Sequence, residues 1–188
     1  MSKKYILASQ SPRRKELLAL LEVDYKVISS DVIETIDSNL KDYEIVMDLA
    51  KQKAEDIATK HPNEVVLGFD TIVVKDHHIL GKPKDDNDSR RMLKLLSNTN
   101  HQVLTGVAII YKEEMHLFYS ETNVFFKELS EEEISDYIKT TEPNDKAGAY
   151  GIQGFGAKFV SKIEGDYYTV MGLPVHMLYQ KLKEFEML

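Results

Sequence analysis

Two segments of the chain combine residue types that suit the binding of a ligand. The first, Ser9-Gln10-Ser11-Pro12-Arg13-Arg14, follows a short apolar stretch, and its Pro12 suits the first position of a helix. Arginines in a first helical turn oppose the helix dipole, and an anion bound between them would remove that conflict. Ser9, Arg13 and Arg14 are therefore candidate phosphate ligands. The alternatives are a capping Ser and two solvated surface arginines.

The second segment, residues 142–154, reads EPNDKAGAYGIQG and has almost no aliphatic bulk. Such a composition does not suit a core helix or a buried strand. Its glycines permit backbone angles and close approaches that a Cβ atom would prevent. We expect a loop that presents main-chain N–H groups, Lys146 and Gln153 to a ligand.

Two carboxylates are candidates for acid–base or metal chemistry. Asp70 follows the apolar run 65–69, where we expect a buried strand to give way to a polar loop. Ligands of open α/β sheets bind at the carboxyl ends of strands, although an Asp in this place can also simply form a turn. Glu34, in an acidic loop, could join Asp70 in a magnesium site, because magnesium takes one or two carboxylates plus substrate phosphates.

Three further polar residues lie where they could contact a ligand. Lys53 falls among the apolar positions of a predicted helix, where it either faces the site or extends its ammonium group to solvent. Lys82 stands between a Gly and a Pro in a stiff loop, which is either a ligand contact or an ordinary surface turn. Thr71 could cap a turn or hydrogen-bond a substrate.

The elements that must position these residues alternate first and become β-rich later, which favours an α/β fold with a mixed sheet. Predicted strands cover residues 4–8, 25–30, 65–70, 71–80 (two short strands around a turn), 101–112, 115–128 and 158–163. Predicted helices cover residues 12–22, 42–60, 86–97, 130–139 and a last helix from Pro174 nearly to the end.

Bulk composition excludes several classes of protein. The 188 residues suffice for one domain or two small lobes, and the hydrophobic fraction of 43% is ordinary for a globular protein. A net charge of −7 argues against nucleic-acid and anionic-membrane binding, so an anionic ligand needs a local cluster of Lys and Arg. The absence of Cys excludes thiolate chemistry. No stretch has the length of a signal peptide or a membrane span, so we expect a cytoplasmic protein.

Taken together, these segments resemble the Maf family of nucleoside triphosphate pyrophosphatases. The resemblance runs over nearly the whole length and rests on several ordered motifs. They are Ser9-x-Ser11-Pro12-Arg13-Arg14, Leu49-Ala50-x-x-Lys53-Ala54, Gly68-x-Asp70-Thr71, Gly81-Lys82-Pro83, His101-x-Val103-x-Thr105, residues 142–154 and Val170-Met171-Gly172-Leu173-Pro174.

The resemblance implies a single domain over residues 1–188, with an elongated central sheet flanked by helices. It implies two lobes around a deep cleft, as in the inosine triphosphate pyrophosphatases, and a homodimer. The implied reaction is hydrolysis of a nucleoside triphosphate, preferably dTTP or UTP or a modified pyrimidine nucleotide, to the monophosphate and pyrophosphate. The implied cofactor is a divalent cation, Mg²⁺ or Mn²⁺, and the task is either cleansing of the nucleotide pool or control of cell division.

The resemblance also assigns roles to individual residues. It makes Asp70 the proton acceptor, and it makes Arg13, Thr71 and Gln153 the residues of substrate selection. The remaining cleft positions are Ser9, Arg14, Glu34, Lys53 and Lys82. Whether Asp70 serves as the base or mainly as a metal ligand stays open.

Two further questions remain open at the level of sequence. Phe69 replaces the Ala usual in the family, and its ring either narrows the pocket or packs in the core. The family's association with septum formation and division arrest leaves a non-catalytic nucleotide-binding regulator as the alternative function. A nucleic-acid-binding role is disfavoured by the acidic net charge.

Overall fold

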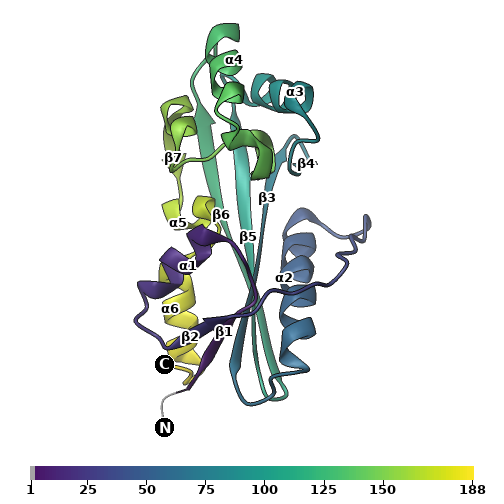
Figure 1. Cartoon of the computed structure of the whole chain (residues 1–188), viewed down its shortest axis with the longest axis vertical. Coiled ribbons are helices and arrows are strands. Elements are labelled where there is room, and N and C mark those ends of the chain that lie inside the picture. The colour runs from purple at the N-terminus through teal and green to yellow at the C-terminus, as the bar shows by residue number, and fades with distance from the viewer. Residues whose placement is uncertain (1–2) are drawn as a thin grey trace. The chain divides into compact units, whose positions relative to one another are not determined.

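The computed structural model describes residues 3–188 as an α/β protein with a mixed sheet flanked by helices, as predicted (Figure 1). The strands are β1 (Tyr5–Leu7), β2 (Tyr25–Val27), β3 (Val65–Lys75), β4 (His78–Leu80), β5 (Asn100–Tyr111), β6 (Glu114–Phe126) and β7 (Val160–Glu164). The α-helices are α1 (Pro12–Ala19), α2 (Asp42–Ala58), α3 (Asp86–Leu96), α4 (Glu131–Lys139), α5 (Tyr167–Met171) and α6 (Val175–Glu184).

The strands pair in the order β2-β1-β3-β5-β6-β7, with β4 on β3. The pairs of β1 with β2 and with β3 are parallel, whereas β4 and β7 join their neighbours antiparallel. By contacts, the described chain divides into two compact units. Strands β3, β5 and β6 contribute residues to both units.

Unit 1 comprises residues 3–70, 105–120 and 172–188 of the described chain. Within it, Tyr5 of β1 pairs with Tyr25 of β2 and Val65 of β3. Helix α2 lies on one side of these strands, and α1 and α6 lie on the other (Figure 1). An apolar core holds α2 against the strands; it contains Ile6, Ala8, Ala50, Ala54, Ile57, Val66, Ala108 and Ile110.

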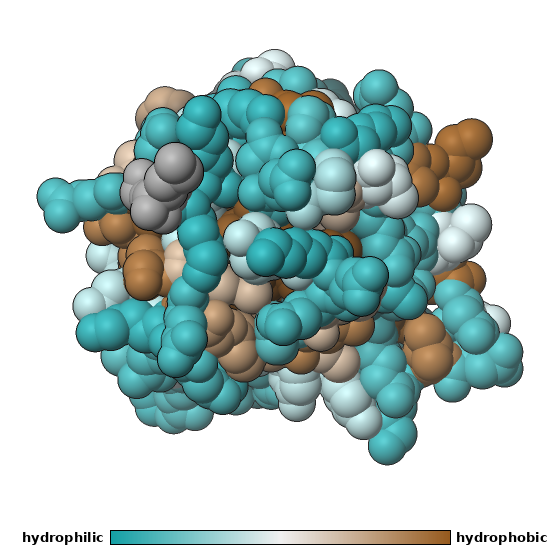
Figure 2. All heavy atoms as spheres, turned by 90° about the horizontal axis from the view of Figure 1, so that it is seen from below, coloured by the Kyte–Doolittle hydropathy of each residue, from teal (hydrophilic) through white to brown (hydrophobic). Residues whose placement is uncertain are grey.

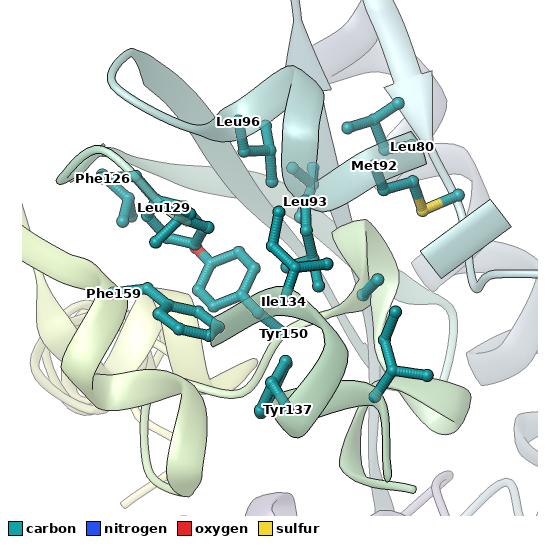
Figure 3. Close-up of a cluster of buried hydrophobic side chains, with 14 of the residues drawn as sticks. Leu80, Met92, Leu93, Leu96, Phe126, Leu129, Ile134, Tyr137, Tyr150 and Phe159 are labelled. Carbon is teal, nitrogen blue, oxygen red and sulfur yellow. The ribbon is translucent and has the colours of Figure 1, made fainter. Parts of the chain in front are cut away.

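Unit 2 comprises residues 71–104 and 121–171. Helix α3 packs against α4, and α4 begins with the predicted capping box, in which the Ser130 hydroxyl and the Glu133 carboxylate each accept the other residue's N–H. Figure 3 shows the apolar cluster of this unit, with the ring of Tyr150 among its members. It includes Leu80, Met92, Leu93, Leu96, Phe126, Leu129, Ile134, Tyr137, Tyr150 and Phe159.

Three local expectations need correction. Strand β3 does not end at Asp70 but continues to Lys75, because the β-branched residues Thr71 to Val74 extend the buried strand. Helix α1 ends at Ala19, before the predicted residue 22, and Glu22 adopts a left-handed conformation. The strand expected at 158–163 starts at Val160, after a 3₁₀-helix at residues 155–159.

The turn at Asp76 and His77 is confirmed, since both residues adopt left-handed backbone angles between β3 and β4.

The surface in Figure 2 is hydrophilic over most of the face shown, with smaller groups of hydrophobic residues between the hydrophilic ones. Among residues 3–188, no helix has both the length and the apolar character needed to cross a membrane.

Candidate active site

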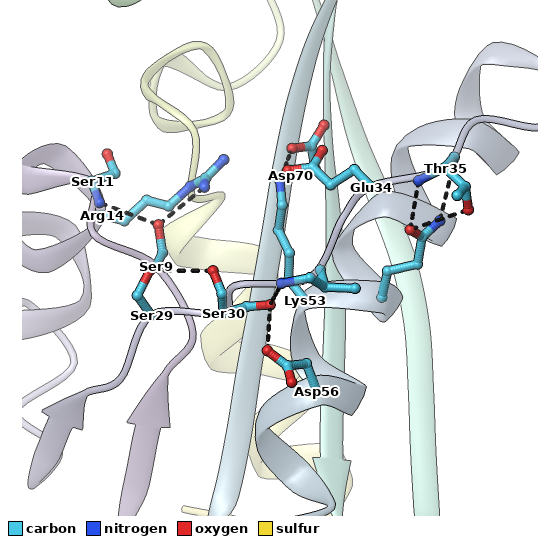
Figure 4. Close-up of polar contacts among 12 residues, drawn as sticks. Ser9, Ser11, Arg14, Ser29, Ser30, Glu34, Thr35, Lys53, Asp56 and Asp70 are labelled. Carbon is cyan, nitrogen blue, oxygen red and sulfur yellow. Dashed lines mark hydrogen bonds and ion pairs between the residues drawn. The ribbon is translucent and has the colours of Figure 1, made fainter.

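The ammonium group of Lys53 contacts two carboxylates in unit 1. Its Nζ donates a hydrogen bond to Oδ1 of Asp70 and lies 3.2 Å from Oε1 of Glu34 (Figure 4). The side chains of Lys53 and Asp70 are only 16% and 14% exposed, whereas Glu34 is 44% exposed. Lys53 therefore faces these acids, and the alternative of a lysine directed to open solvent is excluded.

Small residues bring α2 close enough to β3 for this contact. A Cβ atom on Gly68 would overlap the carbonyl oxygen of Ala50 and lie 2.8 Å from Cβ of Ala54, so only Gly fits there. Gly68 and Asp70 share one face of β3, because side chains alternate along a strand. The helix that packs on Gly68 thus carries Lys53 to Asp70.

The acidic loop that carries Glu34 is attached to α2 by two polar side chains. The side-chain amide of Gln52 accepts the N–H of Thr35 at 3.0 Å and donates to its carbonyl oxygen at 2.8 Å. The carboxylate of Asp56 accepts the hydroxyl of Ser30 at 2.8 Å and the N–H of Asp31 at 3.2 Å (Figure 4). These bonds fix the loop on both sides of Glu34.

Sequence reasoning did not single out Gln52 or Asp56. They stand four residues apart on α2, and polar residues at that spacing ordinarily indicate a solvated helix face. The hydrogen bonds from Ser30 and Lys60 hold the pKa of the Asp56 carboxyl below its ordinary value, with Lys60 the larger cause. The sequence signal for them was their position on α2, with Gln52 next to Lys53 and Asp56 three residues after it.

Arg14 is held in place by contacts within unit 1. Its Nε donates to the carbonyl oxygen of Gly172 at 2.9 Å, and its Nη1 donates to Oγ of Ser9 at 3.2 Å. Ser9 is buried and also accepts the N–H of Ser11 at 3.3 Å. The motif at residues 170–174 therefore supplies a hydrogen-bond acceptor for Arg14, the carbonyl oxygen of Gly172. The sequence of this motif did not indicate that role.

The electrostatics of Arg14 connect it to the acids. Burial lowers the pKa of its guanidinium below the ordinary value; Asp70 and Glu34 oppose this shift, whereas Arg13 adds to it. Arg14 thus shares an electrostatic environment with both carboxylates and with Arg13. One region of unit 1 therefore combines positive charges from α1 and α2 with negative charges from β3 and the acidic loop.

Phe69 answers one of the open questions. It is fully buried, and alternation along β3 directs it away from the face of Asp70. The guanidinium carbon of Arg14 lies 5.9 Å from the centre of its ring, within the range of a cation–π contact. The ring belongs to the core and supports Arg14.

The other candidate residues, Thr71, Lys82 and Gln153, belong to unit 2. Thr71 is partly buried in β3, and Lys82 and Gln153 are exposed. The loop before Lys82 is tied to the Gly-rich segment, because the N–H of Gly148 donates to the carbonyl oxygen of Gly81 at 3.1 Å. Their roles toward a ligand remain predictions.

The Gly-rich segment uses part of its main chain internally, which modifies the expectation that it presents its N–H groups to a ligand. The N–H groups of Gly151, Phe155 and Gly156 all bond to side chains of the protein. Lys146 donates to the carbonyl oxygen of Glu142 at 3.0 Å and to the carboxylate of Asp145 at 2.7 Å. Lys146 thus braces the segment.

Comparison with known proteins agrees with the resemblance noted in the sequence. The model of the Maf-like protein family matches residues 4–185, which include both units. The chain belongs to the Maf family. It is 55% identical over 184 residues to the dTTP/UTP pyrophosphatase of Bacillus cytotoxicus, covering 98% of this chain and 96% of the relative. It is 53% identical to the dTTP/UTP pyrophosphatase of Bacillus mycoides, with the same coverage.

A solved structure supports the fold of this Maf-family chain. The Ham1 protein of Staphylococcus aureus aligns with a TM-score of 0.54 at 16% identity, covering 97% of this chain and all of the other. At that identity the likeness concerns the fold alone. The mixed α/β architecture expected from the sequence is therefore supported by the element order and by this comparison.

Proposed function

We propose that this Maf-family chain hydrolyses dTTP and UTP to the monophosphate and pyrophosphate. The observation that carries the proposal is the contact of Lys53 with both Asp70 and Glu34. The charges of these two acids also act on the guanidinium group of Arg14. The cations Lys53 and Arg14 can bind a triphosphate, and a carboxylate among these residues can activate water. The choice of dTTP and UTP rests on the names of relatives that match this chain over 98% of its length.

The proposed reaction needs charge stabilisation and a positioned water. A water oxygen attacks the α-phosphorus, the bond from that phosphorus to the bridging oxygen breaks, and pyrophosphate leaves. Phosphoryl transfer is mainly positioning and electrostatics, so we assign Arg13, Arg14, Lys53 and Lys82 to the triphosphate. Asp70 orients the water and accepts its proton.

We infer that a divalent cation, Mg²⁺ or Mn²⁺, takes part. Among residues 3–188, no group of three or more His, Asp or Glu residues could hold a metal alone. Two carboxylates directed at one positive charge, as Glu34 and Asp70 are directed at Lys53, suit a cation that also binds substrate phosphates. When bound, such a cation would neutralise charge on the phosphate oxygens.

We further propose that the two units act as one domain over residues 1–188, since the family match spans both. We propose a cytoplasmic homodimer that acts on the free nucleotide and not on nucleic acid. The alternative of a non-catalytic regulator is disfavoured, because a pure binder would not need Asp70 beside Lys53.

The products of hydrolysis test the proposal. Incubation with each nucleoside triphosphate and Mg²⁺ should release pyrophosphate and the monophosphate, and chelation of the cation should stop the reaction. In heavy-oxygen water the label should enter the monophosphate, because the α-phosphorus is attacked. Release of orthophosphate with a diphosphate would mean that the triphosphate lies in another register. Unchanged activity without a divalent cation would remove the metal role of Glu34.

Replacement of Gln153 by Leu should lower kcat/KM for UTP by about tenfold, because an amide can both donate to and accept from the edge of uracil. The cation requirement should stay the same, since Gln153 is not assigned to the phosphates. Pyrophosphate release is measured for wild type and variant on UTP, dTTP, CTP, ATP and GTP. Gln180→Leu, at an exposed position of α6, is the matched control. Equal rates on purines and pyrimidines would contradict the assignment.

A further inference from the structure

The carboxylate of Glu142, the first residue of the Gly-rich segment, accepts hydrogen bonds from the main chain just beyond the other end of that segment. Its Oε1 accepts the hydroxyl of Tyr137 at 2.8 Å and the N–H of Gly156 at 3.1 Å. Its Oε2 accepts the N–H of Phe155 at 2.8 Å. The same Tyr137 hydroxyl accepts the N–H of Gly151 at 3.0 Å. One carboxylate and one phenol thus bind the main chain on both sides of Gln153.

Three glycines around Gln153 lie against side chains of the protein itself. A Cβ atom at Gly154 would overlap Oε2 of Glu142; one at Gly151 would lie 2.7 Å from Cε of Lys146 and 3.1 Å from Oε1 of Glu142. A Cβ atom at Gly156 would lie 2.9 Å from the hydroxyl of Tyr137. The glycines make room for the protein's own side chains, so their spacing does not by itself require a ligand at the main chain.

The charge state of the two side chains suits these bonds. Burial acts to raise the pKa of the Glu142 carboxyl, but the hydrogen bonds from Phe155, Tyr137 and Gly156 outweigh it and the pKa is lowered. Burial, together with the bond to Glu142, raises the pKa of Tyr137. Glu142 is therefore an ionised acceptor, and Tyr137 is a protonated donor.

Gln153 itself is exposed, as is Gly154 beside it. An exposed side chain on a glycine-containing turn has little order of its own, because Gly adds backbone freedom. A side chain that selects one hydrogen-bonding edge must be held in a fixed place before the ligand arrives. The charged side chain that accepts main-chain N–H groups of this turn is Glu142, which accepts those of Phe155 and Gly156.

We infer that Glu142 is a positioning residue for base selection, which fixes the turn that carries Gln153 through the N–H groups of Phe155 and Gly156 and through Tyr137. This inference rests on the proposed function, since it takes Gln153 to contact the base. Glu142 acts through the turn and touches neither the phosphates nor the metal. Its loss should weaken pyrimidine binding and base discrimination, and it should leave the chemical step nearly unchanged.

The variant Glu142→Gln tests the inference in the full-length chain. The amide keeps the size of the side chain, but its NH₂ group faces donors and leaves at least one N–H without an acceptor. We expect KM for UTP to rise about tenfold, as for loss of a hydrogen bond to a charged group, while kcat changes much less. The ratio of kcat/KM for UTP over GTP should fall by a similar factor. Hydrogen exchange, followed by mass spectrometry, should become faster in residues 151–156.

Tyr137→Phe provides the second variant. It keeps the ring packed against Phe159 and removes the hydroxyl shared by Glu142 and Gly151. It should shift KM, discrimination and exchange in the same direction, and the double variant should add little to the larger single effect. Glu132→Gln, which changes an exposed carboxylate in the first turn of α4, is the matched control and should leave all three unchanged.

The outcomes separate the inference from the function on which it rests. A wild-type enzyme without pyrimidine preference would contradict the proposed function. A wild-type preference that Glu142→Gln retains with unchanged KM would overturn only the inference, as would faster exchange without loss of discrimination. If Glu142→Gln does not fold, an unchanged UTP-to-GTP ratio in Tyr137→Phe overturns it instead.

Discussion

Replacement of Asp70 by Asn should lower kcat by about 10²- to 10⁴-fold, the usual contribution of a general base. The amide keeps the shape of the side chain but removes the negative charge that a base or a metal ligand needs. Its amide oxygen can still accept from the ammonium of Lys53, but the ion pair becomes a neutral hydrogen bond, and Glu34 is then the one charged partner among the two acids. Pyrophosphate release from UTP at saturating Mg²⁺ measures the change in kcat.

The fold should survive this substitution, because Asp70 lies in the middle of β3, whose buried neighbours stay as they are. Circular dichroism and the melting temperature check this point. Asp136→Asn is the matched control, since this exposed carboxylate pairs with Lys139 on α4. A rate for Asp70→Asn within a few-fold of wild type would show that the carboxylate serves only the ion pair with Lys53.

Acidification should destabilise unit 2 through His101. This residue is 2% exposed, its Nε2 lies 2.8 Å from the hydroxyl of Tyr150, and its Nδ1 has no hydrogen-bond partner among the described residues. Burial lowers the pKa of His101 from 6.5 to about 3, and the charge of Lys75 acts in the same direction. The folded protein therefore keeps the imidazole neutral.

The sign of the effect follows from proton uptake. Between pH 6.5 and about 3 the unfolded chain binds a proton at His101 that the folded chain does not bind, so stability falls as pH falls. Above pH 6.5 both states are neutral and the contribution is complete. Within the window the loss should approach about 1.4 kcal/mol per pH unit from this residue.

Urea unfolding of wild type and His101→Gln across this pH range isolates the contribution from that of the carboxylates. The Gln side chain can still bond to Tyr150 but does not titrate, so its free energy of unfolding should fall less steeply below pH 6.5. His176→Gln removes an imidazole from the exposed surface of α6 and is the matched control. Parallel curves for wild type and His101→Gln would contradict the prediction.

Elements with local signals were predicted well. The apolar spacing of residues 42–60 gives α2 at Asp42–Ala58, Pro12 begins α1, and the capping box at Ser130 begins α4. These features depend on side chains within one or two turns of each other. Membership of the Maf family could likewise be inferred from ordered motifs, and the family match over residues 4–185 confirms it.

The candidate site could be predicted as a set of residue types but not as an arrangement. Ser9, Arg14, Glu34, Lys53 and Asp70 were each singled out, and the structure brings Ser9 to Arg14 and both acids to Lys53. The supporting residues Gln52 and Asp56 were missed because their partners lie in a distant loop. The roles of Thr71, Lys82 and Gln153 stay predictions.

By itself, the sequence determined the longer helices, the turn at Asp76 and the residue types available for phosphate chemistry; it did not indicate the short helix α5. The tertiary structure decided that Lys53 contacts two acids and that Glu142 occupies the space left by Gly154. The reason is the range of the interactions. Propensities and caps act along a few residues, whereas these contacts depend on the packing of segments far apart in the chain, such as α2 on Gly68.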